Sequence, residues 1–539
     1  MDDRWYKNAI IYEIDLRSYA DSDGDGIGDL RGLIDRLDYL AALGITCIWL
    51  LPFSPSPWRD GGYDVTDHYG VHPELGTPGD FVELVHRAAA RGIRVIIDLV
   101  LNHTSDEHPW FQAARDPDSP LRDHYVWADT PPDDAERGVV FPGVQESTWT
   151  LDERSGKHYF HRFYEFQPDL NVANPDVRAE FRRILGYWIQ QGVAGFRMDA
   201  LPFLIEPAGV ERPKPEPHFE YLKELRAFLQ WRRGDAVLLG EANVERDRVE
   251  DYFTTGGMHM IFNFPLNQLV WLALAKGEAG PIARGLEHTA GIPATDQWAT
   301  FLRNHDEVDL GRLSEKDRQM VFEAFGPEPS MQLYDRGIRR RLAPMLGGDR
   351  RRIEMAMSLL FSLPGTPVIL YGDEIGMGDL LSLDEREAVR TPMQWNDEEN
   401  TGFSTADPDR LARPVISGGD YGYERVNVAA QMRDAGSLLS WMKRLVHTRR
   451  EAPEVGLGDW ELLETGNEHV FGLRAEWEGR EVAVYHNLDG EPQKARMGLE
   501  PTELSHPLEL LGDRDYDEGW SPFELAGYGY RWARVRGVA

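Results

Sequence analysis

Eight short apolar runs recur along this chain, each about the length of one β-strand. Several are continuously apolar rather than alternating, which is typical of parallel strands that are covered on both faces. The pattern therefore predicts a buried parallel sheet. The runs are Ala9–Ile14, Cys47–Leu51, Arg94–Val100, Gly195–Asp199, Ala236–Glu241, Met258–Phe264, Ala299–Asn304 and Val368–Gly372.

Segments with helical periodicity separate several of these runs and end at glycine. Residues 30–41 repeat their apolar side chains at helical spacing before Gly44, and similar segments precede Gly92 and Gly192. A helix closed by a left-handed glycine and leading into a buried strand is half of a βα repeat. Eight such strands predict an α/β fold, a (β/α)8 TIM barrel.

Three stretches depart from this repeat. Residues 102–176 are too many for a loop, so they predict a small inserted domain after the third strand. Residues 307–352 predict a polar, helical, lid-like insertion, whose basic run Arg336–Leu342 we interpret as a solvated helix face. Short strand-like runs in residues 448–539 predict a C-terminal antiparallel β-sandwich. The barrel itself would comprise residues 1–101 and 177–447.

The bulk composition excludes several classes of protein. The formal charge of −33 disfavours binding to nucleic acid or to anionic membranes, because phosphate groups need a basic partner. No apolar run approaches the length of a membrane span, and no signal peptide is visible. Cys47 is the single cysteine and cannot form an internal disulfide. We expect a cytoplasmic enzyme with a small-molecule substrate. The sequence leaves a monomer and a homo-oligomer both open.

Three carboxylates end the fourth, fifth and seventh predicted strands: Asp199, Glu241 and Asp306. Any one of them alone would be interpreted as a helix cap or a surface ion pair. Three together at barrel strand ends, with Arg197, His103 and His305 in the same segments, indicate an active site. Cleaving a glycosidic bond with retention needs a carboxylate nucleophile and a carboxylic acid about 5–5.5 Å apart. A third acid can hold sugar hydroxyls and raise the pKa of the proton donor.

Segments 98–103, 195–199, 239–241 and 303–306 resemble, in order and type, the four signature regions of the α-amylase superfamily (glycoside hydrolase family 13). The resemblance implies that Asp199 is the nucleophile, Glu241 the general acid/base and Asp306 the stabiliser of the transition state. It implies that Arg197 holds the nucleophile ionised and that His103 and His305 bind sugar hydroxyls. Tyr63 and Asp64 resemble the stacking platform and hydroxyl ligand, and Arg390 resembles the charge partner of Asp64.

Within that superfamily the chain is most similar to the trehalose synthases, in patches from about Tyr6 to Pro408. The implied activity is an intramolecular transfer of glucose that interconverts maltose and trehalose. An α-glucosidase, in which water completes the reaction, would use the same residues. A catalytically inactive binding subunit is disfavoured because all three acids are present. Gln167 opens a further marker segment, which indicates either a sugar contact or a Pro-Asp turn. Glu13 stands where many glucosidases of this branch have Gln, and the proline-rich segment 207–218 differs from what is expected of trehalose synthases. Both departures leave the substrate preference open.

An Asp/Gly-rich loop at residues 21–29 offers oxygen atoms at alternate positions, as a hard cation requires. We expect a structural Ca²⁺, or Mg²⁺, held by Asp21, Asp23, Asp25, Asp29 and the carbonyl of Ile27. The alternative is a turn without metal. Resemblance to trehalose synthases implies a second site at Asn102, Asp169 and Glu206, with carbonyls of Phe203 and Leu204. No organic cofactor is expected.

Overall fold

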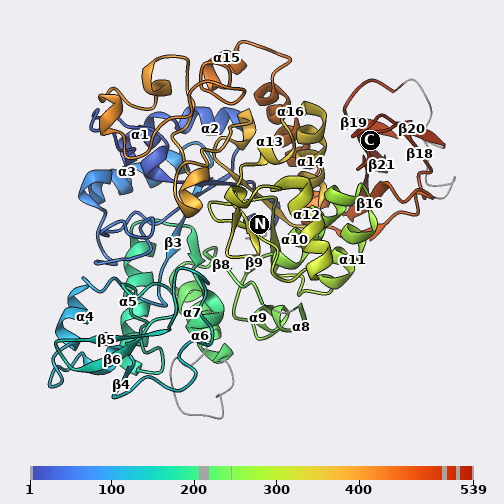
Figure 1. The fold of residues 1–539 in the computed structure, drawn as a ribbon. Coiled ribbons are helices and arrows are strands. Elements are labelled where there is room, and N and C mark those ends of the chain that lie inside the picture. The colour runs from blue at the N-terminus through green and yellow to red at the C-terminus, as the bar shows by residue number, and fades with distance from the viewer. Residues whose placement is uncertain (1–3, 206–217, 245, 500–506, 517–521, 537–539) are drawn as a thin grey trace.

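The computed structural model describes residues 4–205, 218–244, 246–499, 507–516 and 522–536. Its centre is a closed barrel of eight parallel strands, enclosed by helices (Figure 1). The strands follow one another around the ring in chain order. Each predicted run overlaps one strand, so the predicted TIM barrel is confirmed. The strands are β1 (Ile11–Ile14), β2 (Cys47–Leu50), β3 (Arg94–Leu99), β7 (Gly195–Met198), β8 (Val237–Gly240), β9 (Met260–Phe262), β10 (Gln297–Phe301) and β14 (Thr366–Leu370).

The predicted glycine stops are also present. Helix α2 (Leu37–Leu43) ends at Gly44, whose φ of 95° closes the helix and directs the chain into β2. Gly92 and Gly192 are likewise left-handed, after α3 (Pro78–Ala89) and α5 (Pro175–Gln190). No helix within the described ranges is both long and apolar enough to cross a membrane. Further helices of the barrel domain are α1 (Leu30–Asp35), α7 (Phe219–Arg232), α10 (Phe264–Lys276), α11 (Gly280–His288) and α14 (Arg350–Ser362).

The segment after β3 forms a small unit of its own. It contains α4 (Pro109–Ala114) and a three-stranded antiparallel sheet. A backbone bridge between His103 and Asp169 returns its end to the barrel. The unit therefore stands beside the carboxyl ends of the barrel strands. Its strands are β4 (Trp127–Ala128), β5 (Trp149–Asp152) and β6 (Lys157–Phe160).

The insertion after β10 is only partly helical. It contains α12 (Glu315–Phe325) and a small sheet of β11 (Val308–Asp309), β12 (Gln332–Leu333) and β13 (Gly337–Ile338). The prediction that residues 336–342 form a solvated helix face is wrong, because this run crosses β13 and enters the short helix α13 (Leu342–Met345).

Two arginines of the basic run are instead buried and bonded to backbone oxygens. Arg341 is 0% exposed, and its guanidinium donates to the carbonyls of Tyr371 and Val389. Arg339 donates to the carbonyls of Leu381 and Leu383. A buried arginine can be tolerated when several carbonyls accept its hydrogen bonds, and a charge count along the sequence does not reveal that.

The C-terminal region consists of two antiparallel sheets, in agreement with the predicted β-sandwich. Helix α16 (Leu438–Glu451) connects it to the barrel domain. Val470, Tyr485 and Phe523 belong to one buried cluster that joins the two sheets. The larger sheet comprises β15 (Asp459–Leu462), β16 (Val470–Trp477), β17 (Arg480–Asn487), β21 (Tyr530–Arg536) and β19 (Leu508–Gly512), and the smaller β18 (Gln493–Ala495) and β20 (Phe523–Leu525).

Candidate active site

A cavity of about 650 Å³ lies at the carboxyl ends of the barrel strands. Its size is typical of sites that bind small molecules. Five of the side chains predicted from the sequence line it: Tyr63, His103, Asp199, Glu241 and Asp306. Four others stand behind this lining, namely Asp64, Arg197, His305 and Arg390, all at most 3% exposed. The cavity wall is thus made by one set of predicted residues and supported by another.

One guanidinium group holds the nucleophile and the proton donor that the sequence predicts. Arg197, in β7, is 1% exposed, and its Nη1 lies 2.6 Å from Oδ1 of Asp199. Its Nη2 lies 2.8 Å from Oε2 of Glu241. Both nitrogens belong to one rigid planar group, so the two carboxylates are held beside each other. The arrangement suits the separation of about 5–5.5 Å that a retaining mechanism needs.

The backbone after Asp199 adds a second link between the two acids. The N–H of Ala200 donates to Oε2 of Glu241 at 3.1 Å, and Ala200 has a φ of 49°. Positive φ is uncommon for a residue with a Cβ, and such strain persists where the surroundings impose it. The turn that ends β7 therefore fixes Glu241 as well as Asp199.

Burial sets the protonation of this pair. It raises the pKa of Asp199 and of Glu241 to about 7, and Arg197 opposes the rise in each. Two neighbouring carboxyl groups titrate as a pair, because ionising one makes it harder to ionise the other. Near neutral pH the pair therefore holds about one proton. One ionised and one protonated carboxyl group are what a nucleophile and a proton donor require.

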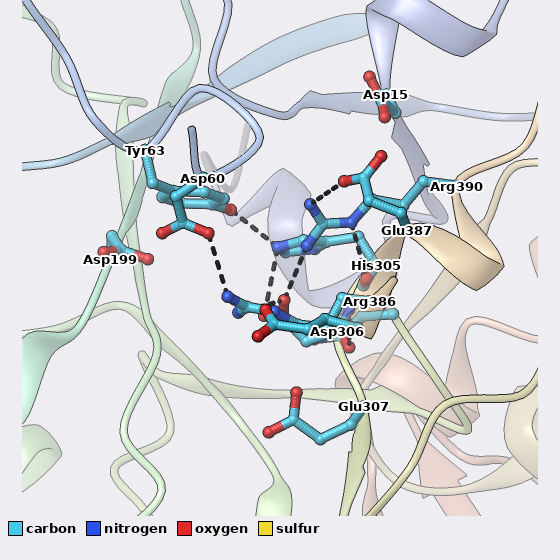
Figure 2. A network of polar contacts seen from close by, with 12 residues as sticks. Asp15, Asp60, Tyr63, Asp199, His305, Asp306, Glu307, Arg386, Glu387 and Arg390 are labelled. Carbon is cyan, nitrogen blue, oxygen red and sulfur yellow. Dashed lines mark hydrogen bonds and ion pairs between the residues drawn. The ribbon is translucent and has the colours of Figure 1, made fainter. Parts of the chain in front are cut away.

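Asp306 differs from this pair because positive charge surrounds it. Its Oδ1 accepts hydrogen bonds from Arg386 and Arg390, both at 3.0 Å (Figure 2). Burial alone would raise the pKa of Asp306, but the guanidinium groups of Arg386 and Arg390 hold it well below its usual value, with the ring of His305 facing its Oδ2 at 3.2 Å. Asp306 therefore stays ionised and is suited to holding a sugar hydroxyl or a developing positive charge, and not to donating a proton.

Tyr63 is fixed by Asp98, an acid to which the sequence assigned no role of its own. The hydroxyl of Tyr63 donates to Oδ2 of Asp98 at 3.0 Å, and Arg197 donates to its Oδ1 at 2.9 Å. His103 contacts the backbone of the same tyrosine, with Nε2 3.2 Å from the carbonyl oxygen of Tyr63. The signal in the sequence was a charged residue inside the third apolar run.

The predicted pairing of Arg390 with Asp64 is wrong. Arg390 instead contacts Asp306, Glu387 and the backbone carbonyl of His305. Asp64 is 0% exposed and accepts hydrogen bonds from Ser56 Oγ at 2.7 Å and from the N–H of Arg59 at 3.1 Å. The carboxylate of Asp64 is therefore bonded within its own loop and does not line the cavity.

Asp60, four residues earlier in the same loop, takes the position that we predicted for Asp64. It lines the cavity, and its Oδ1 lies 3.1 Å from Nη2 of Arg386 (Figure 2). Gln167 donates to its Oδ2 at 2.8 Å. Gln167 is fully buried, so it supports Asp60 without lining the cavity. The sequence places both acids in one loop, and only the structure shows which one turns inward.

The two insertions meet above the cavity. Arg336 of the second insertion donates to the carbonyl of Val140 in the first at 3.0 Å, and its Nε lies 2.9 Å from Asp309 Oδ2. Phe141 and Tyr334, again one from each insertion, share a buried aromatic cluster. Val140, Phe141, Asp309 and Arg336 also line the cavity. Together these contacts form a roof over the three acids.

The Asp/Gly-rich loop brings three of its predicted ligands together. Asp21, Asp23 and Asp29 place carboxylate oxygens within 4.8 Å of one another. Asp25 is not part of this cluster; its Oδ1 accepts from the N–H of Ile27 at 2.8 Å. Closely spaced carboxylates repel each other, and carboxylate oxygens are the type of ligand that a hard cation binds.

The second predicted metal site is only partly described. The carbonyl of Asn102 accepts the backbone N–H of Leu170, next to Asp169, at 2.8 Å, and burial raises the pKa of Asp169 to about 7. Phe203 and Leu204 lie in α6 (Leu201–Ile205). Glu206 lies outside the described residues. This site stays a prediction.

Comparison with known proteins agrees with this geometry. The family model described as "Alpha amylase, catalytic domain" matches residues 13–325 and 336–458. The chain is 43% identical to a trehalose synthase from Pimelobacter sp. (strain R48), over 98% of this chain and 96% of the relative. It is 43% identical to the trehalose synthase/amylase TreS of Mycobacterium tuberculosis, over 99% and 91%. The structure matches the trehalulose synthase MutB from Pseudomonas mesoacidophila with a TM-score of 0.80 at 25% identity, over 98% of this chain and 99% of that chain.

Proposed function

This chain belongs to the alpha-amylase family, and we propose that it interconverts maltose and trehalose by moving one glucosyl unit within its own cavity. The observation that carries the proposal is the pair Asp199 and Glu241, held by Arg197 at 2.6 and 2.8 Å on the wall of one cavity. The choice of disaccharides is supported by the relatives named trehalose synthase, which align along almost the whole chain.

In the first half of the reaction, a carboxylate oxygen of Asp199 attacks the anomeric carbon of the non-reducing glucose of maltose. The bond from that carbon to the bridging oxygen breaks, and the oxygen takes the proton of Glu241. A glucosyl ester on Asp199, a glucose molecule and an ionised Glu241 result. Asp306, which is held ionised by Arg386 and Arg390, stabilises the positive charge on the ring in the transition state.

In the second half, the freed glucose turns and presents its own anomeric hydroxyl to the ester. Glu241 takes the proton of that hydroxyl, the new glycosidic bond forms, and the bond to Asp199 breaks. Two inversions at the donor carbon leave its α-configuration unchanged. The product is trehalose, and the site returns to its starting protonation.

The transfer requires that water stay out while the glucose turns. The roof supports this requirement, because Arg336, which is held by Asp309 in its own insertion, joins the two insertions through Val140. Excluding water protects a reactive intermediate from hydrolysis. In the alternative, an α-glucosidase, water would enter and attack the same glucosyl ester.

Maltose incubated with the protein and isotopically labelled free glucose separates the two functions. The proposal expects trehalose to appear ahead of glucose and to carry little label, because the acceptor never leaves the cavity. Glucose as the sole product would defeat the transfer and leave the α-glucosidase. Asp199→Asn should abolish either product with the fold retained.

We also propose that the cluster of Asp21, Asp23 and Asp29 holds a structural Ca²⁺. The support is the mutual approach of three carboxylates within 4.8 Å and their position at the start of α1, whose N-cap is Asp29. A bound divalent cation would neutralise the repulsion between these groups and fix the loop after β1. The cluster supplies no group to the reaction, so its contribution is to stability.

A further inference from the structure

Glu13, at the centre of β1, is a buried carboxylate to which the proposed mechanism gives no task. It is 0% exposed and lies behind the cavity wall. Its Oε1 accepts the backbone N–H of His305 at 3.1 Å and lies 2.5 Å from Nδ1 of the same residue. Its Oε2 has no hydrogen-bond partner among the described residues. A buried carboxyl group that is bonded only to one histidine calls for an explanation.

The other ring nitrogen of His305 faces two groups that line the cavity. Its Nε2 lies 2.8 Å from the hydroxyl oxygen of Tyr63 and 3.2 Å from Oδ2 of Asp306 (Figure 2). His305 therefore connects Glu13, in the wall of the barrel, to the platform and to the ionised acid of the site. A change that Glu13 causes in the protonation of His305 therefore alters the contacts of His305 with Tyr63 and Asp306.

The hydrogen-bond donors and acceptors around His305 determine which protonation form of its ring these contacts require. Tyr63 has one hydroxyl hydrogen and donates it to Asp98. Its oxygen must then accept a hydrogen from Nε2 of His305, and ionised Asp306 likewise needs a donor facing it. A bare Nε2 would instead point its lone pair at two oxygens. The site therefore requires a hydrogen on Nε2.

We infer that Glu13 is a positioning residue that shares a proton with Nδ1 of His305 and thereby keeps Nε2 protonated towards Tyr63 and Asp306. Protonated Glu13 can donate to Nδ1 of a neutral ring, and ionised Glu13 can accept from Nδ1 of a charged ring. Both forms leave a hydrogen on Nε2. Burial, which raises the pKa of Glu13 and lowers that of His305, favours the first form.

Glutamine at position 13 cannot do the same. In one orientation the amide oxygen accepts the backbone N–H of His305 and also faces Nδ1 at 2.5 Å. Nδ1 must then carry the ring hydrogen, and a neutral ring has no second hydrogen for Nε2. If the amide is rotated by half a turn, its NH₂ group faces the backbone N–H of His305, and two hydrogen-bond donors then face each other without an acceptor. Glu13→Gln thus changes the tautomer while its volume stays almost the same.

Glu374 provides a matched control for this substitution. It is also a glutamate at 0% exposure, and its Oε1 accepts the hydroxyls of Tyr12 at 2.8 Å and Tyr39 at 2.6 Å. A glutamine oxygen can accept both of these hydrogens. Glu374→Gln therefore repeats the change of a buried acid to an amide at a position without contact to the cavity.

The inference rests on the proposed retaining glucosyl transfer, and its test uses maltose consumption, which counts trehalose and glucose alike. We expect Glu13→Gln to lower kcat by roughly 10- to 100-fold, the scale of a lost geometry or a wrong tautomer, with an unchanged ratio of trehalose to glucose. Glu374→Gln should stay within about twofold of the parent protein. If the parent makes only glucose, the proposed isomerisation fails, and the comparison of the two variants still decides the role of Glu13.

A spectroscopic measurement tests the tautomer directly. In protein labelled with ¹⁵N-histidine, the ring signal of His305 is identified by its absence from His305→Gln. We expect the parent signal to show a hydrogen on Nε2, and Glu13→Gln to move it to Nδ1. A bare Nε2 in the parent protein would overturn the inference even if the variant does not fold. Full activity of Glu13→Gln, or an unchanged tautomer in it, would overturn it equally.

Discussion

Asp60 and Arg386 form an ion pair in the wall of the cavity, with 3.1 Å between Oδ1 and Nη2. Arg386 also donates to Asp306 at 3.0 Å, so Asp60 and Asp306 share one cation. Asp64, in the same loop, bonds only to Ser56 and to neighbouring residues of its own loop. The two aspartates of this loop therefore differ in their surroundings: Asp60 lines the cavity, and Asp64 is bonded within the loop.

Replacing each of these aspartates by alanine should separate binding from stability. Asp60→Ala is expected to raise KM for maltose by about 10- to 100-fold, since a charged hydrogen bond contributes about 1.5–3 kcal/mol. Asp64→Ala should instead lower the free energy of unfolding by about 2–4 kcal/mol, because it leaves buried donors unpaired. Steady-state kinetics and urea unfolding of both variants measure this. Equal effects of the two substitutions on KM would contradict the assignment.

The rate should depend on pH on both sides of neutrality. Asp199 must be ionised and Glu241 protonated, and burial raises the pKa of each to about 7. As the pH falls below this value, Asp199 gains a proton and can no longer attack the anomeric carbon. As the pH rises above it, Glu241 loses its proton and can no longer protonate the leaving oxygen. The plot of kcat/KM against pH should be bell-shaped, with both limbs near neutral pH. A flat profile from about pH 5.5 to 8.5 would contradict this protonation scheme.

The roof should control the fate of the glucosyl ester. Arg336→Ala removes the bonds to Val140 and Asp309, so water should enter and the share of glucose in the product should rise severalfold. Arg340→Ala is the matched control, because Arg340 pairs with Asp379 and does not line the cavity. Product analysis on maltose measures both. The same product ratio in Arg336→Ala as in the parent would show that this contact does not keep water out.

Removing calcium should destabilise the fold without touching the chemistry. A ligand present at 100 times its Kd stabilises a protein by about 2.7 kcal/mol, so a chelator should lower Tm measurably. Asp21→Ala should abolish the difference in Tm between calcium and chelator, whereas Asp409→Ala, an exposed acid outside the cluster, should retain it. An identical Tm of the parent protein with and without calcium would exclude a structural calcium.

The barrel could be predicted from the sequence because its signal is local. Continuous burial makes each strand apolar throughout, as in β2 and β8, where every residue is buried. The glycines that end α2, α3 and α5 need positive φ, which favours that residue type. These requirements concern single residues or their neighbours in the sequence, so they can be recognised without knowledge of tertiary contacts.

The support of the site could not be predicted in the same way. Asp60 and Asp64 are the same residue type in one loop, and what distinguishes them is that Asp60 has partners more than 100 residues away, Gln167 and Arg386. Arg341 appears solvated from its charge, yet the carbonyls of Tyr371 and Val389 satisfy it in the interior. Distant acceptors decide the direction in which a polar side chain points, and the local sequence pattern carries no information about those acceptors.

Trapping the covalent intermediate tests the central claim most directly. A fluorinated α-glucosyl fluoride, which forms the ester readily and loses it slowly, should label the protein once per chain. Mass spectrometry of the digested protein should find the sugar on Asp199, with no label in Asp199→Asn. Absence of a stable adduct during turnover of this reagent, or an adduct on Asp98 or Asp306, would contradict the account.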